Sequence, residues 1–67
     1  MQQMLEVEND ANWLVSKIRS CKRAEDLMLC DELMLDFVHQ WGRTAQVEGW
    51  LMTFQLELLR QQALIAP

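Results

Sequence analysis

Residues 27–44, with the sequence LMLCDELMLDFVHQWGRT, decide how this chain folds. Apolar residues recur in this stretch at spacings of 3, 4, 3 and 4, which is the pattern of one helical face: Leu27, Cys30, Met34, Phe37 and Trp41. Gly42 follows directly and suits the left-handed backbone that ends many helices. Thr44 is a favoured N-cap for a new helix. The stretch therefore predicts a helix over residues 24–41, a turn at Gly42 and a further helix over residues 44–65.

The residues before this stretch predict another helix, over residues 4–21. The same alternating spacing runs through Met4, Val7, Ala11, Leu14, Ile18 and Cys21. Asn9 or Asp10 can instead cap a helix that begins later, which would leave the first residues frayed. No Gly or Pro separates this segment from the next, so two separate helices and one long bent helix both fit. The six-residue step from Cys21 to Leu27 puts the two apolar faces out of register, which favours a turn at residues 21–23.

The segment 44–65 carries apolar residues on two opposite sides of one helix. The first stripe consists of Val47, Trp50, Leu51, Phe54, Leu58 and Ile65. The second stripe consists of Met52, Leu56, Leu59 and Ala63. An ordinary surface helix has a single apolar face, which packs on the core. In a three-helix bundle we therefore expect the second stripe to be exposed and to bind a partner, either another protein or a second copy.

The composition predicts a small all-α domain. The chain has 67 residues, is 51% apolar and contains two Gly and one Pro, which are too few turn residues for an all-β fold. A chain of this length buries only a modest fraction of its surface by itself. We expect residues 1–67 to form a single domain, either a three-helix bundle or a bent helical hairpin, completed by dimerisation or by a partner.

Few residues are candidates for catalysis or metal binding. Cys21, Cys30 and His39 are nine residues apart, whereas strong zinc motifs place paired ligands two to four residues apart. Asp36 and His39 share one helical face, but the chain has a single His and cannot supply the two motifs of a di-iron site. We expect two core thiols, no metal, no cofactor and no enzymatic activity, with a small metalloenzyme as a third hypothesis. If the turn at residues 21–23 forms, Cys21 and Cys30 can meet across it.

The charge pattern argues weakly against general nucleic-acid binding. The formal net charge is −4, and Lys and Arg supply most of the affinity for phosphates. Four of the six basic residues nevertheless lie close together and are candidates for contact with an anionic partner: Lys17, Arg19, Lys22 and Arg23. Solvated charges at a helix C-terminus, where the dipole favours cations, explain them equally well. The absence of a long apolar run and of a signal-peptide pattern, with two free thiols, predicts a cytoplasmic protein.

The predicted function is that of a small acidic protein-interaction module: an adaptor, a chaperone, or an inhibitor or regulator of a partner protein. The candidate partner-binding residues are Trp13, Trp50, Met52, Leu56, Leu59 and Ala63. The alternative is a helix-turn-helix-like transcriptional regulator, with residues 37–44 as its turn. The helix after that turn offers Gln46 to DNA but has no Lys or Arg before Arg60, so its chemistry suits DNA poorly.

Overall fold

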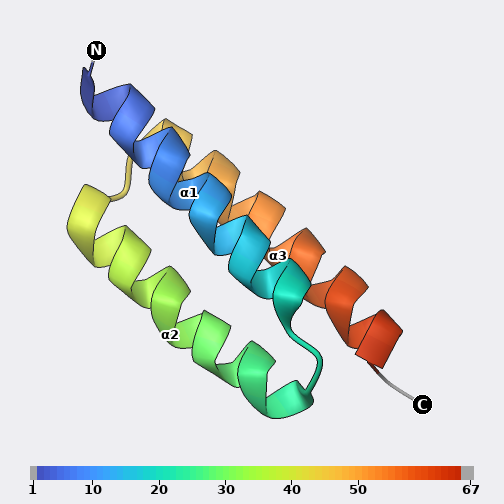
Figure 1. Cartoon of the computed structure of the whole chain (residues 1–67). Coiled ribbons are helices and arrows are strands. Elements are labelled where there is room, and N and C mark those ends of the chain that lie inside the picture. The colour runs from blue at the N-terminus through green and yellow to red at the C-terminus, as the bar shows by residue number, and fades with distance from the viewer. Residues whose placement is uncertain (1, 66–67) are drawn as a thin grey trace.

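The computed structural model describes the backbone of residues 2–65 and the side chains of residues 5–65, and it contains three helices packed against one another. Helix α1 spans Gln2–Ser20, α2 spans Ala24–Trp41 and α3 spans Ala45–Ile65. As Figure 1 shows, α2 runs back along α1, and α3 returns in the direction of α1. Of the two predicted architectures, the chain therefore adopts the three-helix bundle.

The core is built from the apolar faces that the spacing predicts. The buried apolar residues are Val7, Ala11, Leu14, Ile18, Cys21, Leu27, Cys30, Phe37, Val47 and Phe54. The side chain of Phe54 is fully buried, and its ring meets that of Phe37 edge-on, with the centroids 5.2 Å apart. Such a pair adds about 0.5–1.5 kcal/mol beyond the burial of its surface. Met4 was also predicted to face the core, but its side chain lies outside the described residues.

The first turn separates α1 from α2, so the long bent helix does not form. The amide of Cys21 donates to the carbonyl of Ile18 over 3.2 Å, and Arg23 is extended at φ −131° and ψ 151°. The carbonyl of Arg23 then accepts from the amide of Asp26 over 3.1 Å, which opens α2. At the other end of α1, the helix already includes Gln2, so the alternative start at Asn9 or Asp10 is wrong. The reason lies in tertiary structure, because Asp10 contacts α2 instead of capping α1.

The second turn depends on Gly42. Its amide donates to the carbonyl of Val38 over 2.8 Å and closes α2. Its φ of 80° is positive, as predicted, but its ψ of 173° lies outside the left-handed helical region, in a region that glycine almost alone can adopt. Thr44 caps α3 as predicted, since its Oγ1 accepts from the amide of Val47 over 3.2 Å.

Long-range hydrogen bonds fix α1 against both other helices. The indole Nε1 of Trp41 in α2 donates to Asp10, over 2.9 Å. In α3, Glu57 accepts two hydrogen bonds from Arg19, of 2.7 and 3.1 Å. In the described part of the chain, no other helix covers the opposite side of α3, where Met52, Leu56 and Leu59 are exposed.

Candidate protein-interaction surface

The second stripe lies on the side of α3 opposite the core. Met52 and Leu56 are each 67% exposed and Leu59 is 62% exposed, whereas Phe54 is fully buried. Ala63 is exposed as well. Because each residue advances the helix by 100°, all four side chains lie roughly opposite Phe54. The stripe is about 17 Å long at a rise of 1.5 Å per residue. It therefore forms a continuous apolar surface.

Neutral side chains border most of the second stripe. Glu57 turns toward α1, where the hydrogen bond from Arg19 lowers the pKa of its carboxyl below the ordinary value. Glu48 is held by Arg43, with Nη1 and Oε1 2.9 Å apart. The remaining charged residue of α3 is Arg60, which lies on one side of the exposed leucines. Gln55 and Gln62 lie on the other side of the stripe. The surface is therefore apolar in its centre and almost uncharged at its edges.

The outer surface of α2 has the opposite character. Its three exposed large apolar residues, Met28, Leu29 and Leu35, are interrupted by carboxylates. The exposed acidic residues of this helix are Glu25, Asp31, Glu32 and Asp36. Most of the negative charge of the chain thus lies away from the second stripe.

The two tryptophans that were predicted to bind a partner lie apart from the second stripe. Trp50 is half-buried and stacks on Phe54, with ring centroids 6.1 Å apart and planes 26° apart. It belongs to the packing of the first stripe. Trp13 is 50% exposed but lies in the groove between α1 and α2, where Lys17 Nζ is 5.5 Å from the centroid of its ring.

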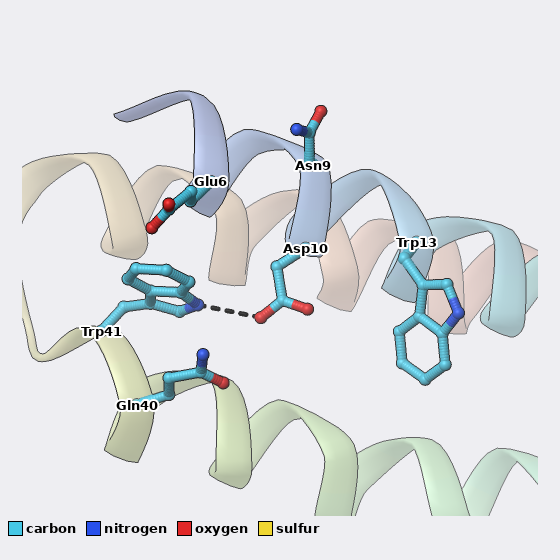
Figure 2. A pocket seen from close by; sticks show the side chains of 6 residues that line it. All are labelled: Glu6, Asn9, Asp10, Trp13, Gln40 and Trp41. Atoms are coloured by element: carbon cyan, nitrogen blue, oxygen red, sulfur yellow. Dashed lines mark hydrogen bonds between the residues drawn. The ribbon is translucent and has the colours of Figure 1, made fainter. Parts of the chain in front are cut away.

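That groove has a volume of about 430 Å³ and is lined by Glu6, Asn9, Asp10, Trp13, Gln40 and Trp41. Figure 2 shows Asp10 between the two indoles, facing Trp41, while Asn9 points away. Carboxylates beside aromatic rings can bind a cation. Here, however, Asp10 already accepts from Trp41, and Lys17 already lies near the ring of Trp13. The groove therefore serves contacts within the chain.

Sequence reasoning missed the role of Asp10. The signal was its spacing, because it follows Val7 by three residues and precedes Leu14 by four, which places it at the edge of the buried face of α1. A carboxylate at the margin of a core needs a donor from a neighbouring helix. A tryptophan is one of the few partly apolar side chains that can supply such a donor.

The basic residues near the end of α1 are exposed but do not act as one free cluster. Arg19 binds Glu57, and Lys17 lies near Trp13. Arg23 lies 3.9 Å from Glu25. An anionic ligand would have to compete with these internal contacts, and Lys22 is the member of the cluster best placed to meet one.

The two thiols meet across the first turn. The Sγ atoms of Cys21 and Cys30 are 3.5 Å apart, both residues are buried, and Sγ of Cys21 also donates to the carbonyl of Lys17 over 3.2 Å. Burial, together with the hydrogen bond to Cys21, raises the pKa of the Cys30 thiol to about 12. His39 is exposed on α2, and in the part of the chain that the structure describes no three His, Cys, Asp or Glu side chains gather around a possible metal position.

The start of α3 does not offer the chemistry of a DNA-reading helix. Its exposed residues include Ala45, Gly49 and Met52, while Arg43 just before it is paired with Glu48. Base edges and phosphates require donors, which Ala45, Gly49 and Met52 do not supply, and the donors of Arg43 are engaged by Glu48.

Comparison with protein-family models, with curated proteins and with solved structures found no match for this chain. Among the described residues, none of the helices combines the length and the apolar character needed to cross a bilayer.

Proposed function

We propose that this chain is a protein-interaction module that binds its partner through the second stripe of α3. The observation that carries the proposal is the exposure of Met52, Leu56 and Leu59 in one continuous row opposite the core. Contiguous apolar surfaces on small proteins usually mark interaction sites, and the nearly uncharged border lowers the cost of removing water from this one.

The size of the apolar gain constrains the kind of partner. Full burial of a Leu or Met side chain stabilises by about 1.5–3 kcal/mol, so the three side chains at their present exposure contribute roughly 3–6 kcal/mol. Association itself costs about 4–15 kcal/mol. The partner must therefore bring apolar side chains of its own. An apolar helix or an apolar groove meets this requirement, and an adaptor, chaperone or inhibitor would use such a contact.

The proposal is tested by affinity capture with matched variants. The tagged chain is incubated with nuclease-treated lysate of the source organism, and bound proteins are identified by mass spectrometry. The test variant carries Leu56→Asp and Leu59→Asp. The control carries Met28→Asp and Leu35→Asp, which change two residues of comparable exposure, 70% and 62%, on the outer side of α2.

We expect one recurrent partner, either a foreign protein or the untagged chain itself, with the wild type and the control, and none with the test variant. Equal loss of binding in both variants would contradict the proposal. Circular dichroism supplies a second criterion. If Leu56→Asp and Leu59→Asp unfold the chain as Phe54→Asp does, the second stripe belongs to the structural core and the proposal fails.

A further inference from the structure

We infer that the partner of the second stripe is a second copy of this chain, with α3 pairing antiparallel to α3. This inference rests on the proposed function and names the occupant of the same surface. It is carried by the spacing, the side-chain sizes and the charges of the exposed side of α3.

The spacing is that of a coiled-coil seam. With two more exposed residues toward its N-terminus, the second stripe becomes a row with steps of 4, 3, 4, 3 and 4: Ala45, Gly49, Met52, Leu56, Leu59 and Ala63. A strict alternation of three and four residues is narrower than the usual buried face of a helix and fits one further helix with the same repeat. Among the described residues α3 alone exposes such a row, because Asp31 and Glu32 interrupt the apolar residues of α2.

The side-chain sizes along this row suit an antiparallel pair. When the two-fold axis lies midway between Met52 and Leu56, Met52 of one copy lies beside Leu56 of the other, and Leu56 of the first lies beside Met52 of the second. Gly49 then lies beside Leu59 of the second copy, and Ala45 beside Ala63. A small residue thus meets a large one at Gly49 and Leu59, while residues of similar size meet in the middle and at the two ends.

Gly49 supports this pairing because the fold of a single chain does not explain it. Glycine lowers helix stability, and a Cβ atom at this position would meet nothing within 4 Å beyond its neighbours in the chain and the nearby backbone of its own helix. Its backbone is helical and lacks the positive φ of Gly42. In the antiparallel pair, the missing side chain gives room to Leu59 of the second copy.

The charges favour a second copy over a strongly charged foreign partner. The chain has a net charge of −4, and its exposed carboxylates are concentrated on α2. Two copies that meet through α3 bring almost uncharged surfaces together and keep the acidic sides of α2 away from the contact. A basic or acidic partner would find little opposite charge on this surface.

The row offers a smaller contact area than a standard interface. From Ala45 to Ala63 the row is about 27 Å long, and with a helix about 10 Å wide its footprint is roughly 270 Å². A standard interface buries about 800 Å² on each partner. The dimer is therefore expected to be weak and to exchange with the monomer.

The first test is sedimentation equilibrium of the full chain from about 5 to about 500 µM. We expect the mass of the wild type and of the Met28→Asp/Leu35→Asp control to double with concentration. The Leu56→Asp/Leu59→Asp variant should stay monomeric with unchanged helicity. A wild type that is monomeric over the whole range, or doubling that survives the change at Leu56 and Leu59, would overturn the inference. The wild type can also be monomeric and yet capture a foreign protein that the Leu56→Asp/Leu59→Asp variant does not capture. In that case the proposed function stands and only the second copy is excluded.

The second test addresses the orientation. The Gly49→Cys and Leu59→Cys variants are mixed and oxidised mildly. The wild type, treated in the same way, shows how much linkage comes from the two buried native thiols. The antiparallel pair predicts a disulfide-linked dimer in the mixture and little with either variant alone. Efficient linkage of Gly49→Cys to itself would overturn the antiparallel pairing.

Discussion

Trp41 at the end of α2 donates its indole hydrogen to Asp10 in the first half of α1, and the two heavy atoms are 2.9 Å apart. The two residues are separated by 31 positions in the sequence, so the bond holds the helices together. It is partly buried, which shields it from water and strengthens it.

Removal of this hydrogen bond should destabilise the bundle. We expect Trp41→Phe to lower the free energy of unfolding by about 1–2 kcal/mol, because Asp10 loses its donor. Asp10→Asn should cost less, since its amide oxygen can still accept. Urea unfolding of Trp41→Phe, Asp10→Ala and the double variant gives the coupling energy between the two residues. A coupling close to zero would show that the contact does not stabilise the fold.

Acid should weaken the link between α1 and α3. The hydrogen bonds from Arg19 lower the pKa of Glu57 below its ordinary value of 4.5, so the carboxylate contributes stability above that value and loses it as the pH falls below. Glu57→Gln should therefore lower the melting temperature at neutral pH, and this difference should shrink in strong acid. The effect will be modest because Arg19 is exposed. Melting curves of the wild type and Glu57→Gln between about pH 2 and pH 7 test this. A difference in melting temperature that does not change with pH would contradict it.

Alkali should destabilise the fold through Cys30. Burial raises the pKa of its thiol from 9.0 to about 12, so the folded chain keeps this proton when the unfolded chain has lost it. The free energy of unfolding should fall as the pH rises from about 9 toward 12, by up to about 1.4 kcal/mol per pH unit. Denaturant unfolding in the presence of a reductant measures this slope. Cys30→Ala should flatten it, and an equally steep slope in that variant would assign the effect to other groups.

The two glycines should respond in opposite directions to substitution by alanine. Gly49→Ala is expected to stabilise the chain by about 0.5–1 kcal/mol, because the position is helical and open. Gly42→Ala should destabilise by at least about 1 kcal/mol, because φ is 80° there. Thermal unfolding at a concentration low enough to keep the chain monomeric compares the two. Equal shifts of the same sign would contradict this account.

The core could be predicted from the sequence because it depends on periodicity within each helix. The alternating apolar face of α2 includes Leu27, Cys30 and Phe37, and all three are buried. The same arithmetic separated the two stripes of α3, with Phe54 inside and Leu56 outside. Periodicity is a property of one helix, so it needs no knowledge of the neighbours.

The contacts between helices could not be predicted in this way. The pairing of Arg19 with Glu57, 38 residues away, depends on how far one helix is shifted along the other, which spacing within a helix does not determine. The contact of Cys21 with Cys30 was predicted only on the condition that the turn at residues 21–23 forms, which the spacing favoured but did not determine. Trp50 was proposed as a partner-binding residue because of its type, although its position belongs to the face that packs on Phe54.

One contact near the end of α3 bears on the synthesis of the chain. The side-chain amide of Gln61 donates over 2.7 Å to the carbonyl of Cys21, 40 residues earlier, and so joins the last turns of α3 to the connection between α1 and α2. A polypeptide that leaves the ribosome from its N-terminus has completed α1 and α2 well before this bond can form. The bundle can therefore close only after nearly all of α3 has been made, so its folding follows the synthesis of these residues and does not accompany it.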